Sequence, residues 1–90
     1  MKTNPALNPT AFIVLNPVAG LTNAQILQRH IENRFHASGW NTRFHVTRAE
    51  DTIAALVREE LANGVDLVVA VGGDGTIAAV SGGMVNSSVP

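Results

Sequence analysis

Three glycines surround a single acid in the stretch "GGDGT", residues 72–76, directly after an apolar run. Glycine has no Cβ, so its backbone can turn tightly and lets a ligand come close. If a helix begins at Gly75 or Thr76, its unpaired N–H groups and its dipole form a site for an anion such as a phosphate. Asp74 is the only acid in this loop, and a carboxylate there could hold Mg²⁺ through water or accept a proton from a hydroxyl group.

The same residues also suit a purely structural role. In that interpretation the glycines shape a strand-to-helix turn and the Asp74 side chain caps the helix. The loop contains the looser dinucleotide pattern G-x-G-x-x-A as well, but it follows the third expected strand rather than the first. Locally, the pattern indicates either a phosphate site or a turn.

Two further polar loops follow expected strands. In "NPVAG", Pro17 and Gly20 predict a turn, and Asn16 can present its amide to a ligand or bond its own loop. Thr47 follows the second expected strand. Thr47 and Glu50 have the spacing of a capping box, so the Thr47 hydroxyl serves either the next helix or a nucleotide.

The strands that would position these loops are short. The continuous apolar runs 11–15 and 66–71 are typical of strands covered on both faces, and we expect 66–71 to be the central strand. In "NTRFHVT", Phe44 and Val46 alternate with polar residues, which is typical of a half-buried or edge strand.

Three helices are expected between and after the strands, within 21–39, within 50–64 and from 76 onward. Apolar residues recur every three or four positions in the first two, and Gly39 and Gly64 are natural helix ends. Thr22 and Gln25 have capping-box spacing at the start of the first helix. The pair Gly82-Gly83 weakens the third helix.

This order of elements predicts an α/β fold, β-α-β-α-β-α, with helices packed on a short parallel sheet in three layers. Such sheets bind ligands at the carboxyl ends of their strands. All three polar loops follow strand ends, so we expect them to meet at one edge.

Composition limits the other possibilities. Apolar residues make up 46% of the 90 residues, charged residues 14%, and the net charge is −1, as in ordinary soluble domains. The basic residues do not form a stripe of the kind that binds nucleic acid. Cysteine is absent, and His30, His36 and His45 are dispersed, which disfavours a Cys- or His-based metal site. We expect a loose leader at 1–10, one domain at 11–90, and a cytoplasmic protein.

Taken in order, the three loops resemble those of the diacylglycerol kinase catalytic domain family, to which sphingosine kinases and bacterial lipid kinases are related. The resemblance spans about residues 10–90. It implies that the chain is the amino-terminal part of a nucleotide-binding lobe with the diacylglycerol/NAD kinase-like fold. It also implies an enzyme that uses ATP and Mg²⁺ to phosphorylate a lipid hydroxyl. Asp74 matches the aspartate that relatives use in metal binding or as a proton acceptor. The residues that the resemblance assigns to nucleotide binding are Asn16, Pro17, Gly20, Thr47, Gly72, Gly73, Asp74, Gly75 and Thr76.

The chain departs from the family pattern at two places. Ala78, Ala79 and Val80 follow Ile77 where the family usually has Asn-Glu-Val, and residues 50–52 replace a Gly-Asp/His-Ala. Because the family continues into a second nucleotide loop and a β-rich lipid-binding domain, we expect this chain to be an amino-terminal piece that transfers no phosphoryl group by itself. Those further parts would carry the contact with a lipid substrate such as diacylglycerol and with the membrane periphery.

Two alternatives remain open from the sequence. An NAD kinase shares the "GGDGT" signature and phosphorylates a nucleotide ribose, whereas a non-catalytic module would bind a nucleotide without turnover. The exposed edges of a three-strand sheet also leave room for a homo-oligomer.

Overall fold

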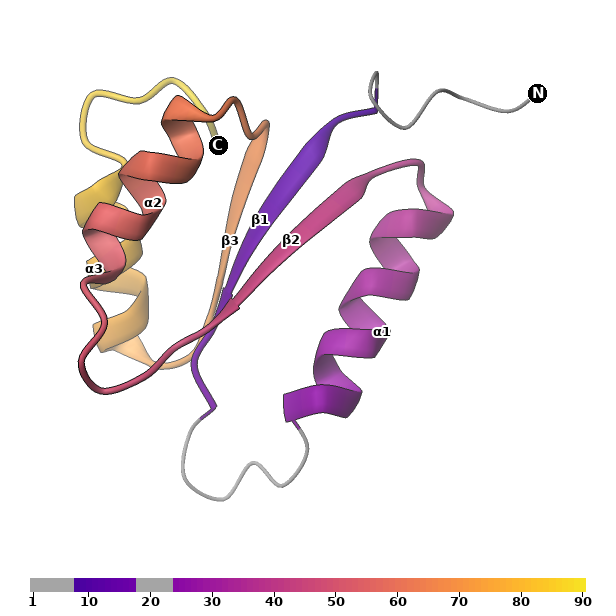
Figure 1. The fold of residues 1–90 in the computed structure, drawn as a ribbon, viewed down its shortest axis with the longest axis horizontal. Helices are drawn as coiled ribbons and strands as arrows, with labels where there is room; N and C mark the ends of the chain where they lie inside the picture. Colours follow the sequence, from indigo (N-terminus) through magenta and orange to yellow (C-terminus); the bar gives the residue numbers. More distant parts are fainter. Residues whose placement is uncertain (1–7, 18–23) are drawn as a thin grey trace.

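Strands and helices alternate along the whole described chain. The structure, a computed structural model, describes residues 8–17 and 24–90. Helix α1 covers one face of the sheet, and α2 and α3 cover the other (Figure 1). This arrangement confirms the expected three-layer α/β fold. The elements are β1 (Thr10–Leu15), α1 (Ala24–Ala37), β2 (Asn41–Val46), α2 (Ile53–Ala62), β3 (Leu67–Val71) and α3 (Asp74–Gly83).

The three strands are parallel and lie in the order β2-β1-β3. The expectation that 66–71 forms the central strand is therefore wrong for the described sheet, because β1 occupies that place. Residues 11–15 of β1 are all buried, whereas every residue of β3 is only half-buried. A continuous apolar run is typical of a strand covered on both faces, but it does not reveal which strands flank it.

Helices α1 and α2 end where the glycines predicted. Gly39 and Gly64 have φ angles of +84° and +92°, values that favour glycine. After α1, the Trp40 N–H donates to the Phe35 carbonyl oxygen over 3.0 Å, as in a Schellman motif. Thr22, from the expected capping box, lies outside the described residues. None of the helices in the described ranges has the length and hydrophobicity needed to span a bilayer.

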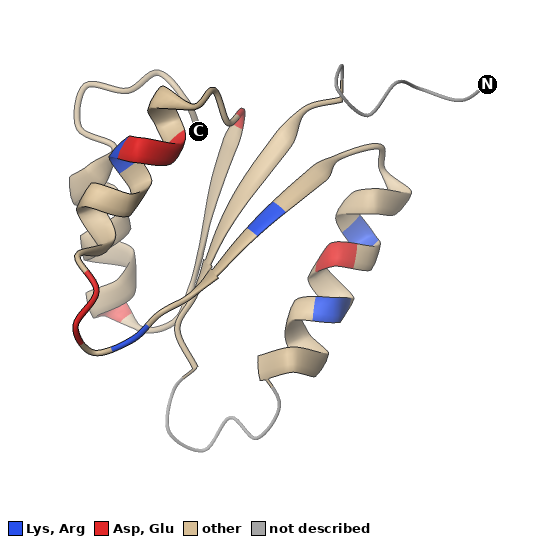
Figure 2. Ribbon diagram, viewed as in Figure 1, with Lys and Arg blue, Asp and Glu red and all other residues tan. Residues whose placement is uncertain are grey.

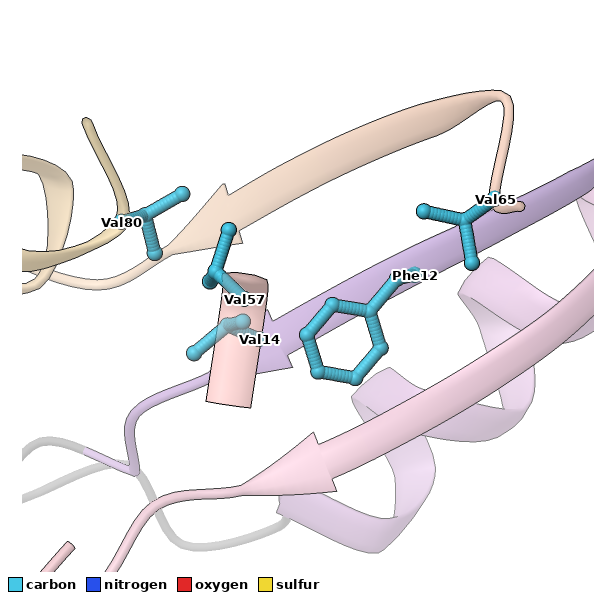
Figure 3. Packing of buried hydrophobic residues seen from close by; sticks show 5 residues of the cluster. All are labelled: Phe12, Val14, Val57, Val65 and Val80. Atoms are coloured by element: carbon cyan, nitrogen blue, oxygen red, sulfur yellow. The ribbon is translucent and has the colours of Figure 1, made fainter. Parts of the chain in front are cut away.

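The larger part of the core lies between the sheet and the layer formed by α2 and α3 (Figure 3). Phe12 and Val14 of β1 point into this layer and meet Val57 of α2 and Val80 of α3. Val65, just before β3, closes the same cluster. All five side chains are at most 5% exposed. Burying them anchors α2 and α3 on the sheet and so fixes where α3 begins.

The edge strand β2 is held to α2 by an ion pair across the layer. Arg43 Nη2 donates to Glu60 Oε2 over 3.0 Å, and Arg43 Nε lies 2.6 Å from Glu60 Oε1. Only 12% of the Glu60 side chain is exposed, so this carboxylate depends on its partner. The pair fixes the strand that leads to the second polar loop.

The two glycines at the end of α3 have different roles. The helix continues through both, and a Cβ on Gly83 would lie 2.6 Å from the Ala54 carbonyl oxygen and 2.8 Å from Val57 Cβ. A Cβ on Gly82 would meet nothing within 4 Å. Gly83 therefore lets α2 and α3 approach closely, while Gly82 has no such constraint.

We expect Gly83→Ala to lower the free energy of unfolding by about 1–3 kcal/mol, because one of the helices must shift to relieve the overlap. The matched variant Gly82→Ala should leave it unchanged or raise it by up to about 1 kcal/mol through helix propensity. Urea unfolding of both variants measures the difference. Equal stabilities would show that close helix contact at Gly83 is unimportant.

Candidate functional site

The three polar loops meet at the carboxyl edge of the sheet, as the sequence predicted (Figure 1). Backbone hydrogen bonds continue the sheet into them: the Asn16 N–H donates to Val71 over 2.8 Å, and the Thr47 N–H donates to Leu15 over 2.9 Å. Between the loops lies a cleft of about 660 Å³, a volume within the range of small-molecule sites. Its lining residues are Asn16, Pro17, Thr47, Arg48, Ala49, Asp51, Ile53, Gly73, Gly75 and Thr76.

One side chain, that of Asn16, joins all three loops. Its Oδ1 accepts from the Thr47 hydroxyl over 2.9 Å, and its Nδ2 donates to Thr76 Oγ1 over 2.9 Å. Thr76 is only 4% exposed, so the bridge extends into the buried base of the loop. Both ends of the amide are thus engaged, and Asn16 sets the spacing of the loops around the cleft.

Thr47 belongs to this bridge and not to a helix cap. Helix α2 begins at Ile53 with Thr52 as its N-cap, which excludes the alternative that Thr47 and Glu50 form a capping box. The segment 47–52 is a loop that passes along the cleft before the helix starts. The hydroxyl of Thr47 donates to Asn16 instead.

Helix α3 begins inside the glycine loop, at Asp74, with Gly73 as its N-cap. The Thr76 and Ile77 N–H groups donate to the Gly73 carbonyl oxygen over 3.0 and 3.1 Å. Among the described residues, no group accepts from the N–H of Gly73, Asp74 or Gly75. These N–H groups stand at the positive end of the helix dipole and are the donors that a phosphate needs.

One of the three glycines packs against the Asn16 bridge, and the other two leave space in the cleft. A Cβ on Gly72 would lie 2.7 Å from Thr76 Oγ1 and 3.0 Å from Asn16 Cβ, so only glycine fits against the bridge. A Cβ on Gly73 or Gly75 would meet nothing within 4 Å. Both of these glycines line the cleft, and their missing side chains leave the N–H groups open to a ligand.

Asp74 does not cap its helix. Within the described parts of the chain its carboxylate accepts no hydrogen bond, which contradicts the interpretation that Asp74 caps the helix. It is exposed and stands between two glycines of the cleft wall without lining the cleft itself. Its carboxylate is therefore available at the rim.

Comparison with known protein families shows the family to which a chain with this cleft belongs. The family model of the diacylglycerol kinase catalytic domain matches residues 10–90. The chain belongs to this family. A search of curated proteins found no match. Members of the family are kinase-type phosphotransferases, and the cleft described above is the part of this kinase-family domain that contains its glycine loop.

The kinase-family domain also has a hydrogen-bonded acid in the lining of the cleft, and the sequence did not reveal its bonds. Asp51 Oδ2 accepts from His45 Nε2 over 2.7 Å and from the Arg48 N–H over 2.6 Å. These two bonds, the His45 bond first, hold the pKa of Asp51 below its ordinary value of 3.8. Asp51 is therefore a carboxylate at neutral pH, and His45, a polar residue of the expected edge strand, is bonded to it.

The domain offers few groups for a metal ion. No cluster of three or more His, Asp or Glu side chains is arranged to hold one within the ranges 8–17 and 24–90. Mg²⁺ is commonly bound through one or two carboxylates together with phosphate oxygens and water. The exposed carboxylate of Asp74 fits such a shared site, but not a site built from protein ligands alone.

Most of the predicted site residues share this edge of the domain. Gly20 lies outside the described residues, and the nucleotide-binding and catalytic roles of the others stay predictions. Arg48 and Asp51, in the polar loop that follows the second strand, line the cleft as well. The sequence did not reveal that Asp51 accepts hydrogen bonds from His45 and from the Arg48 N–H.

We expect Asn16→Ala to lower the free energy of unfolding by about 1–3 kcal/mol, because it removes two side-chain hydrogen bonds and leaves the buried Thr76 hydroxyl without its partner. Asn33→Ala, at an exposed position of α1, is the matched control and should leave stability unchanged or slightly higher. Urea denaturation of both variants gives the comparison. If Asn16→Ala were as stable as the wild type, the bridge would not hold the loops together.

Proposed function

We propose that this chain is the ATP-binding segment of a lipid kinase that transfers the γ-phosphoryl group of ATP to a lipid hydroxyl, as in diacylglycerol. One observation carries the proposal: in a member of this kinase family, the open N-terminus of α3 stands beside a cleft at the carboxyl edge of the sheet. Ligands of such sheets bind at this edge.

The phosphates of ATP would lie on the N–H groups of Gly73, Asp74 and Gly75. These donors have no acceptor in the described parts of the chain, and the two glycines leave room for phosphate oxygens. Asn16, Thr47 and Thr76 would act on the nucleotide mainly by holding the three loops at a fixed spacing. Positioning of this kind supplies most of the rate in phosphoryl transfer.

Asp74 would act at the rim of the cleft. Mg²⁺, when bound there with the nucleotide, neutralises charge on the phosphate oxygens. The Asp74 carboxylate would hold that ion or accept the proton that the lipid hydroxyl loses. In the transfer, the hydroxyl oxygen forms a bond to the γ-phosphorus as the bond from the γ-phosphorus to the β,γ-bridging oxygen breaks and ADP leaves.

A non-catalytic nucleotide-binding module is the second candidate. It is favoured by Ala78 and Ala79, which provide no polar groups where the family usually has an amide and a carboxylate. An NAD kinase activity is disfavoured by the family match over residues 10–90. The module and the kinase share the nucleotide site and differ only in turnover.

The test is phosphoryl transfer from labelled ATP by the intact enzyme, with diacylglycerol vesicles and NAD as separate acceptors. Label in the lipid supports the proposal, and label in NAD contradicts it. ATP binding without transfer to either acceptor favours the non-catalytic module. The isolated 90-residue chain should transfer nothing, and lipid phosphorylation by the pure chain would refute that part of the account.

A further inference from the structure

The lining of the cleft includes a cation as well as the glycine loop. Arg48 lines the cleft together with Gly73 and Gly75, and it is the only Lys or Arg among the lining residues of the described chain. Its side chain is exposed and makes no hydrogen bond or ion pair with any described residue, and its charge is one of the lesser causes that lower the pKa of Asp51. Figure 2 shows that the loop between β2 and α2 carries both basic and acidic residues and lies close to the acidic first turn of α3.

The backbone around Arg48 is fixed from two sides. The Arg48 N–H donates to Asp51 Oδ2 over 2.6 Å, and the Asp51 N–H donates back to the Arg48 carbonyl oxygen over 3.1 Å. His45, on strand β2, donates to the same carboxylate oxygen over 2.7 Å. The His45 and Asp51 side chains are only 28% and 16% exposed, so the contact is partly shielded from water. The strand thus holds Asp51, and Asp51 holds the loop that carries Arg48.

We propose that Arg48 binds the phosphates of the nucleotide together with the α3 N-terminus, and that Asp51 and His45 are positioning residues that present it. This inference rests on the proposed function, because it assumes a polyphosphate in the cleft. It adds the one Lys or Arg side chain among the described lining residues to donors that otherwise come from the backbone. Hydrogen bonds between a guanidinium and phosphate are strong and geometrically selective.

The direction in which Asp51→Asn changes the affinity for a polyphosphate distinguishes a positioning role from a purely electrostatic one. Asp51 is negative and lines the cleft, so removing its charge would strengthen the binding of a polyphosphate if it acted only through space. If Asp51 positions Arg48, the isosteric Asp51→Asn weakens binding instead, because an amide nitrogen or a neutral oxygen replaces an ionised acceptor of two hydrogen bonds. The two roles predict changes in opposite directions.

The experiment is a calorimetric titration of the 90-residue chain with Mg-ATP and, separately, with adenosine. Arg48→Gln should weaken Mg-ATP binding about tenfold and leave adenosine binding unchanged, because the lost contact is to phosphate. Arg48→Lys should recover part of the loss. The matched control is Arg58→Gln, which removes an exposed arginine of α2 that does not line the cleft and should change neither affinity. Circular dichroism confirms that each variant is folded.

A double-mutant cycle tests the positioning role. Asp51→Asn and His45→Gln should each weaken Mg-ATP binding in the wild-type background but have little further effect when Arg48 is already Gln. Tighter Mg-ATP binding by Asp51→Asn would overturn the positioning role. An equally large loss of Mg-ATP affinity when Arg48 is already Gln would overturn it as well. Unchanged Mg-ATP affinity in Arg48→Gln would overturn the role of Arg48, while ATP binding by the wild type would still support the proposed function. No ATP binding by the folded wild type would overturn both.

Discussion

Asp74→Asn in the intact enzyme is expected to lower the rate of phosphoryl transfer at least about 100-fold. The exposed carboxylate stands beside the N–H groups proposed to hold phosphate, and no other acid lies in the loop 72–76. An amide of the same size neither accepts a proton nor holds Mg²⁺ with a negative charge. Steady-state transfer of labelled phosphate to lipid vesicles measures the change.

The fold should tolerate this substitution. Asp74 makes no side-chain capping bond, so its contribution to stability is limited to a favourable charge at the positive end of α3, about 1 kcal/mol at most. The control is Glu59→Gln, which removes an exposed acid of α2 and should keep full activity. Turnover within about threefold of the wild type for Asp74→Asn, on the scale of general acid–base effects, would remove Asp74 from the mechanism.

Gly75→Val is expected to weaken the binding of Mg-ATP about tenfold or more without unfolding the chain. A Cβ at this position meets no protein atom within 4 Å, yet Gly75 lines the cleft, so the added methyl groups enter the space proposed for phosphate. Displacing a phosphate from its N–H donors loses about 1.5 kcal/mol or more, which corresponds to a tenfold change in affinity. Calorimetric titration of the chain measures it.

Gly82→Val provides the matched control on the same helix. A Cβ on Gly82 would also meet nothing within 4 Å among the described residues, but Gly82 lies at the far end of α3 and does not line the cleft. Both substitutions replace a helical glycine with a residue of better helix propensity, so neither should reduce stability. Equal ATP affinities for the two variants would show that the glycine loop does not hold the nucleotide.

The spacing of apolar residues and the positions of glycines were sufficient to predict the order of strands and helices. They were also sufficient to predict the edge of the sheet at which the loops meet. Gly39 and Gly64 ended their helices as expected, because a positive φ favours glycine and the signal is local. The convergence of the three loops followed from parallel strands, whose carboxyl ends share one edge. Helix α3 differed in beginning at Asp74, one residue before the earliest expected start.

Contacts between segments far apart in the chain were beyond local patterns. The strand order depends on how the crossovers cover the two faces, so the apolar run of β3 was wrongly assigned to the centre. Spacing alone left open whether the Thr47 hydroxyl serves a helix cap or a nucleotide, whereas in the fold it bonds Asn16, 31 positions away. His45 likewise looked like an ordinary polar strand residue until the fold placed it against Asp51.

The most direct test of the nucleotide site is nuclear magnetic resonance of the ¹⁵N-labelled chain during titration with Mg-ATP, and with adenosine for comparison. We predict that Mg-ATP produces its largest amide shift changes at Gly73, Asp74 and Gly75, with smaller ones at the Asn16 side-chain amide, and that adenosine leaves the three glycine-loop signals in place. Saturable ATP binding with its largest changes elsewhere, for example along α1, would contradict the account. So would a folded spectrum that ATP does not change.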